Sequence, residues 1–425
     1  MKTKVSVIAL ILVCVLSLGL LTSCQEKIDE SGLETTPSDT TATNAPAYDG
    51  YTLNGTPIGD YTVIFSESSG SEGQKIARLL VSAIKEKTGE SLSLRSDVNP
   101  LASGKEIVVG DTNRMLPTLS HSYPNGDGYV IAASEGKIFV YGADMVCTVK
   151  AIREFERQLS ALNEEKRELT IENKSYADLD TSLVAMSFNL WIDQSSWQER
   201  APAVLSVIKN VSPDTFGVQE ADIKWMNYLS DNLPNYAYVG VGRDGGTKGE
   251  YSAVFYRTDV FELFEGGTQW LSDTPSTPSK YSESAYNRIF SYALLNRKSD
   301  GRKILHINTH LDHISGSARE KQTAVLVNFL NQHNDVPVLL SGDFNAIRSS
   351  RELSAIFEAG YQTSADLALC SDGTRATFPS GNKVIDYIFV KKDICDIYEY
   401  RVDTSEPNGI QPSDHYPVYI QYDLK

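Results

Sequence analysis

Apolar residues recur at helical spacing in the N-terminal half of the chain. Across Glu72–Gly89 they fall at Ile76, Leu79, Leu80 and Ile84, which lie on one face of a helix, and Gly89 suits its C-terminal cap. Extended apolar runs around this helix predict strands. The other predicted elements are strands at Tyr61–Phe65 and Lys105–Gly110, a hairpin at Asp127–Gly142 that turns at Glu135-Gly136, and a helix at Met145–Leu162. We therefore expect a small α+β domain over residues 58–176.

A second pattern begins at Leu183, where short apolar strands alternate with amphipathic helices. The predicted helices are Trp197–Asn210, Ile223–Asn232 and Ser317–Gln332. The predicted strands are Leu183–Phe188, Thr215–Val218, Tyr251–Tyr256, Phe290–Leu295, Lys303–Asn308, Val336–Leu340, Val384–Val390 and Val418–Tyr422. This alternation predicts a layered α/β domain over residues 181–425.

The first residues have the pattern of an export signal. Lys2 and Lys4 precede an apolar run, Val5–Leu21, and the residues LTSC end at Cys24. This pattern resembles the bacterial lipoprotein signal, in which the cysteine is lipidated, and an ordinary secretory signal is the alternative. The resemblance predicts a signal peptide over 1–24 and an extracytoplasmic protein anchored to a membrane through Cys24. Residues 25–57, rich in Thr, Ser, Glu and Pro at their start, are predicted to be a flexible tether.

Composition limits the range of partners. The chain of 425 residues carries a formal net charge of −16, so a broad basic face for nucleic acid is not expected, although a local basic cleft would not show in this sum. Outside the leader, Cys147, Cys370 and Cys395 remain, with no CxxC motif and no metal-ligand spacing. A disulfide between Cys370 and Cys395 is possible, but the spacing does not require it.

Polar side chains follow several of the predicted strands of the second domain. Residues 338–346 read VLLSGDFNA, and in an extended chain Asp343 and Asn345 project to the same side. A turn is the alternative for these two residues. The other polar residues are Asn189, Glu220, His310, Asp312, His313, Asp386, Asp414 and His415. Asp386 lies inside an apolar strand, where an ionised carboxylate needs a partner, and one shared site explains the set better than separate turns.

Six motifs in order, FNLW, GVQE, NTHLDH, SGDFNA, IDYIFV and SDHYPV, resemble those of the endonuclease/exonuclease/phosphatase superfamily of metal-dependent phosphoesterases. The resemblance covers residues 183–425. It implies a four-layer α/β sandwich of two packed mixed β-sheets flanked by helices, with the site at one end between the sheets. A smaller α+β accessory domain would precede this sandwich.

The resemblance also implies roles for individual residues. Glu220 is expected to hold Mg²⁺, with Mn²⁺ possible, and Asn189 and Asp414 would lie close to the ion as further ligands. Asp343 and Asn345 would orient the attacking water and the scissile phosphate. His415 would act as a base held by Asp386, and His310 would donate to a phosphate oxygen or to the leaving group.

Three further residues have two interpretations each. Glu250 matches the glutamate that orients the histidine corresponding to His310 in deoxyribonuclease-like members, or it is a solvated charge at a strand edge. Arg288 resembles the arginine that binds the substrate phosphate, or it is an ordinary surface arginine. His313, in the LDH triplet common in a bacterial branch, either adds a ligand or only packs.

The favoured hypothesis is a surface-anchored, Mg²⁺-dependent hydrolase of phosphate esters, a phosphodiesterase or nuclease, or a phosphatase. The fold does not choose between small phosphoesters, nucleic acid and lipid headgroups. The alternative is a glycan-binding surface lipoprotein with an inactive phosphoesterase-like domain, because residues 58–176 loosely resemble accessory domains of bacterial glycoside hydrolases. A glycoside hydrolase that uses paired carboxylates is a third hypothesis, but it leaves the histidines and asparagines unexplained.

Overall fold

The computed structural model describes residues 49–100, 104–117, 119, 128–177, 182–373, 375–392 and 395–424. The signal peptide, Cys24 and most of the predicted tether lie outside the described residues. Within the described ranges, no helix combines the length and the apolar character needed to cross a membrane. Cys147, Cys370 and Cys395 are buried, and the disulfide considered for Cys370 and Cys395 is not formed.

The described residues between 52 and 176 form two sheets and two α-helices. A six-stranded sheet has the order β4-β3-β5-β7-β6-β9, and its strands are β3 (Thr62–Phe65), β4 (Ser93–Ser96), β5 (Glu106–Val109), β6 (Tyr129–Ser134), β7 (Lys137–Gly142) and β9 (Lys174–Tyr176). The helices are α1 (Gly70–Thr88) and α2 (Met145–Leu159). A three-stranded sheet consists of β1 (Thr52–Leu53), β2 (Thr56–Pro57) and β8 (Glu168–Leu169).

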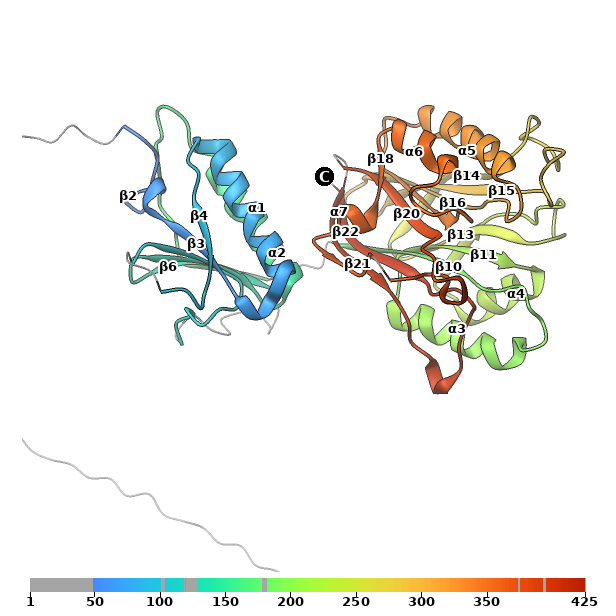
Figure 1. The fold of residues 1–425 in the computed structure, drawn as a ribbon, viewed down its shortest axis with the longest axis horizontal. Coiled ribbons are helices and arrows are strands. Elements are labelled where there is room, and N and C mark those ends of the chain that lie inside the picture. The colour runs from blue at the N-terminus through green and yellow to red at the C-terminus, as the bar shows by residue number, and fades with distance from the viewer. Residues whose placement is uncertain are drawn as a thin grey trace, which may run out of the picture. The chain divides into compact units, whose positions relative to one another are not determined.

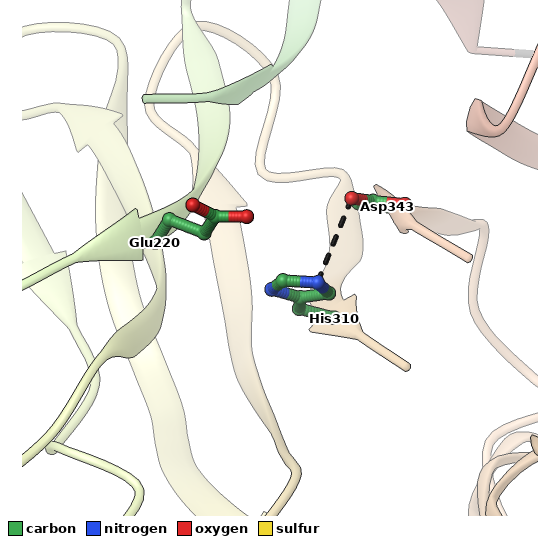
Figure 2. Close-up of side chains that lie close together, drawn as sticks. All are labelled: Glu220, His310 and Asp343. Atoms are coloured by element: carbon green, nitrogen blue, oxygen red, sulfur yellow. Dashed lines mark ion pairs between the residues drawn. The ribbon is translucent and has the colours of Figure 1, made fainter. Parts of the chain in front are cut away.

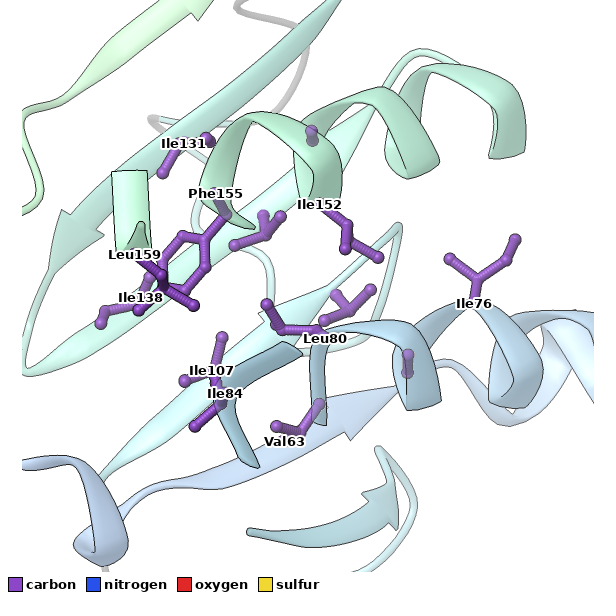
Figure 3. Close-up of a cluster of buried hydrophobic side chains, with 14 of the residues drawn as sticks. Val63, Ile76, Leu80, Ile84, Ile107, Ile131, Ile138, Ile152, Phe155 and Leu159 are labelled. Atoms are coloured by element: carbon purple, nitrogen blue, oxygen red, sulfur yellow. The ribbon is translucent and has the colours of Figure 1, made fainter. Parts of the chain in front are cut away.

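The predicted hydrophobic stripe of α1 forms part of this region's core. Ile76, Leu80 and Ile84 are buried against strand residues and α2 residues such as Phe155 (Figure 3). Gly89 caps α1 in the left-handed conformation, with φ of 79°, as the sequence predicts. Residues 52–57 of the predicted tether belong to this folded region, because Leu53 is buried and β1 pairs with β8.

Residues 183–424 form two further sheets. The first has the order β12-β13-β11-β10-β22-β21-β19 and the second the order β14-β15-β16-β17-β20-β18. Strands of the first are β10 (Leu183–Asn189), β11 (Thr215–Ala221), β12 (Tyr236–Val239), β13 (Tyr251–Arg257), β19 (Cys370–Ser371), β21 (Cys395–Val402) and β22 (Val418–Leu424). Strands of the second are β14 (Phe261–Trp270), β15 (Ile289–Arg297), β16 (Lys303–His310), β17 (Val338–Asp343), β18 (Tyr361–Thr363) and β20 (Asp386–Lys391).

The two sheets pack face to face and are covered by helices on their outer faces, as the strands and helices of this region show in Figure 1. The helices are α3 (Trp197–Val211), α4 (Ile223–Asn232), α5 (Gly316–Asn331), α6 (Ser354–Glu358) and α7 (Ser364–Leu367). α3 and α4 pack on the first sheet through Val204 and Trp225, and α5 packs on the second through Leu326. Residues of both sheets share the core between them. The predicted four-layer sandwich is confirmed.

The ten-residue edge strand β14 contains two adjacent glycines and ends at Trp270. Gly266 and Gly267 are typical of a turn, but here they let the strand approach neighbouring side chains, because a Cβ at Gly266 would lie 3.0 Å from Val239. Trp270 is buried, and its Nε1 donates to the carbonyl of Arg243 at 2.6 Å.

A buried polar layer joins the two sheets beneath the edge where the motifs lie. His306 of β16 contacts the hydroxyls of Thr215 and Ser341 through its two ring nitrogens, each at 2.8 Å. Asn308 Oδ1 accepts from Gln219 Nε2 at 2.6 Å. Each hydrogen bond satisfies a polar group that would otherwise be costly to bury, so these contacts fix how one sheet lies on the other.

Candidate active site

One row of side chains crosses the second sheet at its edge. β16 and β17 are parallel neighbours, and β17 pairs with antiparallel β20, so that the register sets His310 beside Asp343 and Asp343 beside Asp386. Residues paired in this way project from the same face of a sheet. His310 Nε2 lies 3.5 Å from Asp343 Oδ2, and all three side chains are buried. Strand register thus brings together residues that are far apart in the sequence.

The first sheet contributes Asn189 and Glu220 at the ends of the parallel strands β10 and β11. Asn189 Nδ2 donates to Glu220 Oε1 at 3.1 Å and to Asp343 Oδ2 at 3.0 Å, so it joins carboxylates from different sheets. Its Oδ1 accepts from the backbone N–H of Trp191. Glu220 has a φ of 56° at a register shift between β11 and β13, and such a bulge re-aims a side chain. Figure 2 shows its carboxylate turned toward His310 and Asp343.

Asp414 and His415 precede β22, which pairs with β10. His415 Nδ1 lies 2.9 Å from Asp386 Oδ2. A carboxylate can only accept, so Nδ1 carries the proton in this contact. His415 Nε2 then faces Asp343 Oδ2, at 3.8 Å. The structure therefore contains the histidine–carboxylate pair that the sequence places at the site.

Asn345 lies beyond the end of β17 with a φ of 49°. Its backbone N–H donates to Asp343 Oδ1 at 2.9 Å, and its Nδ2 lies 3.0 Å from His310 Nε2. This left-handed conformation, which asparagine tolerates better than most residues, ties the loop after β17 to β16. The other ring nitrogen of His310, Nδ1, is buried and has no partner among the described residues.

The charged groups of the site shift one another's pKa values. Burial, followed by the charge of Asp386, raises the pKa of Asp343 to about 7. Burial lowers the pKa of His415, but the neighbouring carboxylate of Asp386 outweighs it, and the pKa rises to about 10. Burial and then the charge of Arg288 hold the pKa of His310 well below its usual value. Burial also raises the pKa of Asp414, and the charge of Glu220 adds to this shift.

The remaining two predicted residues lie beside this cluster. Glu250, just before β13, forms an ion pair with Arg243 Nη1 at 2.8 Å, and it makes no hydrogen bond to His310 Nδ1. Arg288, just before β15, is buried rather than an ordinary surface arginine, and its Nη2 lies 3.1 Å from His313 Nδ1. The orienting role of Glu250 and the phosphate-binding role of Arg288 stay predictions.

The arrangement fits a divalent cation. Two groups of side chains could each hold an ion, because in each group one ligand atom per residue lies within 4.8 Å of the others. The first group is Glu220, His310 and Asp343, and the second is Asp343, Asp386 and His415. Asp386 Oδ1 is buried with no hydrogen-bond partner in the described part of the chain. Clustered buried carboxylates need positive charge close by, and carboxylate oxygens are the ligands that Mg²⁺ prefers.

Arg200 is a residue that sequence reasoning missed. It lies on α3, is buried, and donates to the carbonyls of Leu190, Trp191, Asp193 and Pro412 at 2.7–2.9 Å. It thereby holds the loop after Asn189 against the segment that leads to Asp414. An arginine in an amphipathic helix gives no signal of this role, because its partners are backbone carbonyls of distant segments.

The family model described as the endonuclease/exonuclease/phosphatase family matches residues 186–415. The chain belongs to the endonuclease/exonuclease/phosphatase family. This confirms the resemblance carried by the six motifs. Members of the family are hydrolases that act on phosphoesters and depend on divalent metals.

Similar proteins support this assignment. A solved endonuclease/exonuclease/phosphatase family protein from Bacteroides thetaiotaomicron is 32% identical, with a TM-score of 0.52, over 57% of this chain and 97% of that one. A mannosyl-6-phosphatase of the same species is 31% identical, with a TM-score of 0.52, over 57% of this chain and 99% of that one. Carbon catabolite repressor protein 4 homolog 4 of Arabidopsis thaliana is 23% identical over 299 residues, which are 54% of this chain and 71% of that one.

Proposed function

We propose that this endonuclease/exonuclease/phosphatase family member is a Mg²⁺-dependent hydrolase of phosphate esters at the outer surface of a bacterial membrane. One observation supports the proposed enzymatic activity: side chains from the two sheets lie close together at one site. The first sheet contributes Glu220 and Asn189, and the second contributes His310, Asp343 and Asp386. Mn²⁺ is an alternative ion. When bound, the ion supplies positive charge for the phosphoryl oxygens.

The chain's own residues then bind, orient and exchange protons. Asp343 and Asn345 orient the attacking water, and the carboxylate of Asp343 accepts a hydrogen bond from it. Asp386 holds His415 with Nε2 toward the reacting centre. Arg288 binds a phosphate oxygen, and His310 donates to the leaving group. Glu220, with Asn189 and Asp414 beside it, holds the ion.

A small phosphorylated sugar is the substrate class that we favour. The similarity to a mannosyl-6-phosphatase, at 31% identity over most of that chain, supports this choice. The net charge of −16 is unfavourable for approach to long nucleic acids. Nucleic acid and lipid headgroups are the other substrate classes that the experiment must include.

Phosphoester hydrolysis by the purified protein tests the proposal, measured as inorganic phosphate for monoesters and as the released alcohol or monoester for diesters. We expect activity with Mg²⁺ or Mn²⁺ on p-nitrophenyl phosphate or its bis ester, sugar phosphates, nucleotides, DNA, RNA or phospholipids, and loss of activity with a chelator. Asp343→Asn and His415→Asn should each lower kcat by about 10²–10⁴-fold. Asp335→Asn, the same change on an exposed residue, is the matched control. Full activity in either site variant would remove the assigned roles.

Binding without catalysis is the competing function. If no phosphoester is hydrolysed while the full chain binds glycans, the glycan-binding lipoprotein with an inactive domain is the better account. A glycan contact by residues 58–176 is also compatible with an active enzyme.

Membrane attachment has its own test. Cys24→Ala should move the protein from the membrane fraction to the soluble fraction and remove a lipid detectable by mass spectrometry. Cys14→Ala, inside the leader, is the matched control. Unchanged membrane attachment of the Cys24 variant would exclude the lipid anchor.

A further inference from the structure

Three loops meet beside the catalytic cluster. They are residues 241–250, between β12 and β13, residues 282–288, before β15, and residues 311–315, after β16. Asn287 Nδ2 donates to Asp244 Oδ1 at 3.0 Å and so links the first loop to the second. Buried Asp312 links the second to the third, because its Oδ2 accepts from the Ser284 hydroxyl at 3.0 Å and the Ala285 N–H at 2.7 Å. These contacts hold the three loops in one arrangement.

Side chains from each loop stack on one another. The ring of Tyr286 lies nearly parallel to that of His313, with a centroid separation of 5.9 Å and an interplanar angle of 13°. The guanidinium of Arg243 lies 4.4 Å from the centre of the Tyr286 ring. Arg243 is itself held by the ion pair with Glu250. We call Arg243, Tyr286 and His313 the aromatic wall.

The hydrogen bond between Arg288 and His313 fixes the proton on the imidazole. Arg288 Nη2 lies 3.1 Å from His313 Nδ1. A guanidinium has donors and no acceptor, so Nδ1 must accept, and a neutral His313 carries its proton on Nε2. The wall therefore presents one N–H donor of defined position next to a tyrosine ring.

The aromatic wall borders the reacting centre. Arg288 bonds His313. Arg288 also directly precedes β15, in which Phe290 pairs with Thr309, the residue before His310. Arg288 Nε is buried without a partner among the described residues. Tyr286 is nonetheless 50% exposed, which is unusual for a large ring with so many neighbours. The structure thus keeps an aromatic side chain accessible next to the group assigned to the phosphate.

We propose that Tyr286 and His313 bind the alcohol part of the phosphate ester, and that this alcohol is a hydroxylated ring such as a hexose. This inference rests on the proposed function. The C–H face of a sugar ring packs on an exposed aromatic side chain, and a sugar hydroxyl accepts from His313 Nε2–H. The Tyr286 hydroxyl and the exposed carboxylate of Asp244 provide further partners for hydroxyls, which both donate and accept. Arg243 is a positioning residue that holds the Tyr286 ring.

The test compares substrates that share the phosphate and differ in the alcohol. For the wild-type protein, kcat/KM should be higher on hexose 6-phosphate than on ethyl phosphate, which has neither ring nor hydroxyl. Tyr286→Ala should lower kcat/KM on hexose 6-phosphate by about tenfold and leave ethyl phosphate within about twofold. Tyr286→Phe keeps the ring and should keep most of the preference. Tyr238→Ala, a partly exposed tyrosine of β12 outside the wall, is the control.

His313→Asn separates the two functions of the imidazole. The asparagine oxygen can still accept from Arg288, but the Nε2–H donor is lost, so the preference for hexose 6-phosphate should fall by about tenfold. Equal losses on both substrates in the Tyr286 and His313 variants would overturn the inference, and so would a wild-type kcat/KM that is no higher on hexose 6-phosphate than on ethyl phosphate. Calorimetric titration with hexose 6-phosphate separates the two claims. Binding that depends on Tyr286, without turnover, would refute the proposed hydrolysis and support the wall.

Discussion

His306 provides a sharp test of the packing between the two sheets. It is fully buried, and burial lowers its pKa to about 3. Its ring nitrogens contact two hydroxyls and no carboxylate, so nothing in these contacts compensates a positive charge. In the unfolded chain the pKa is about 6.5. The folded state therefore binds this proton less readily than the unfolded state.

The sign and size of the effect follow from this difference. The folded state keeps its full stability with respect to His306 above pH 6.5, and this stability is lost as the pH falls toward 3. One pKa unit corresponds to about 1.36 kcal/mol. The change from pH 8 to pH 5 therefore lowers the free energy of unfolding by roughly 2 kcal/mol, and complete protonation of His306 lowers it by roughly 5 kcal/mol. Other groups titrate over the same range, so the quantity to measure is the difference between wild type and His306→Gln.

Urea unfolding followed by tryptophan fluorescence measures this difference in the right region, because all four tryptophans lie within residues 183–425. At pH 8 the variant should be less stable by about 1–3 kcal/mol, since two buried hydroxyls lose their partner. At pH 5 the difference in free energy of unfolding between wild type and His306→Gln should be smaller by about 2 kcal/mol. His333→Gln, which changes a partly buried histidine two residues after α5, is the control. A gap that is constant from pH 8 to pH 5 would refute this account.

Three further predictions concern positioning and packing. Asp386→Asn removes the charge that raises the pKa of His415, and kcat for phosphate release should fall by about 10²–10⁴-fold with a shifted pH profile. Arg200→Met removes four hydrogen bonds to backbone carbonyls and should lower the free energy of unfolding by about 3 kcal/mol, measured by urea titration. Gly217→Ala places a Cβ 2.3 Å from a side-chain oxygen of the facing sheet and should abolish soluble expression. Gly104→Ala, with nothing within 4 Å, should express normally.

Elements with strong local signals were predictable. The helix Ile223–Asn232 has the predicted bounds, because Asp222 caps it and its apolar residues lie on one face. The Glu135-Gly136 turn adopts positive φ at both residues, as a two-residue hairpin turn requires. The edge strand β14 and the strand β21 were not predicted. Pairing with β15 and β22 stabilises them, and the local sequence does not contain these partners.

The chemical groups that follow the strands could be predicted from the sequence alone. Its motifs placed Glu220, Asp343 and His415 next to strand ends, and the same motifs indicated the protein family. The partner of each group was decided by the tertiary structure. Register set His310 beside Asp343, and Glu250 paired with Arg243. Local pattern encodes the direction in which a side chain projects, whereas contacts between distant segments depend on how the sheets pack, because hydrogen-bond partners are chosen by distance in space.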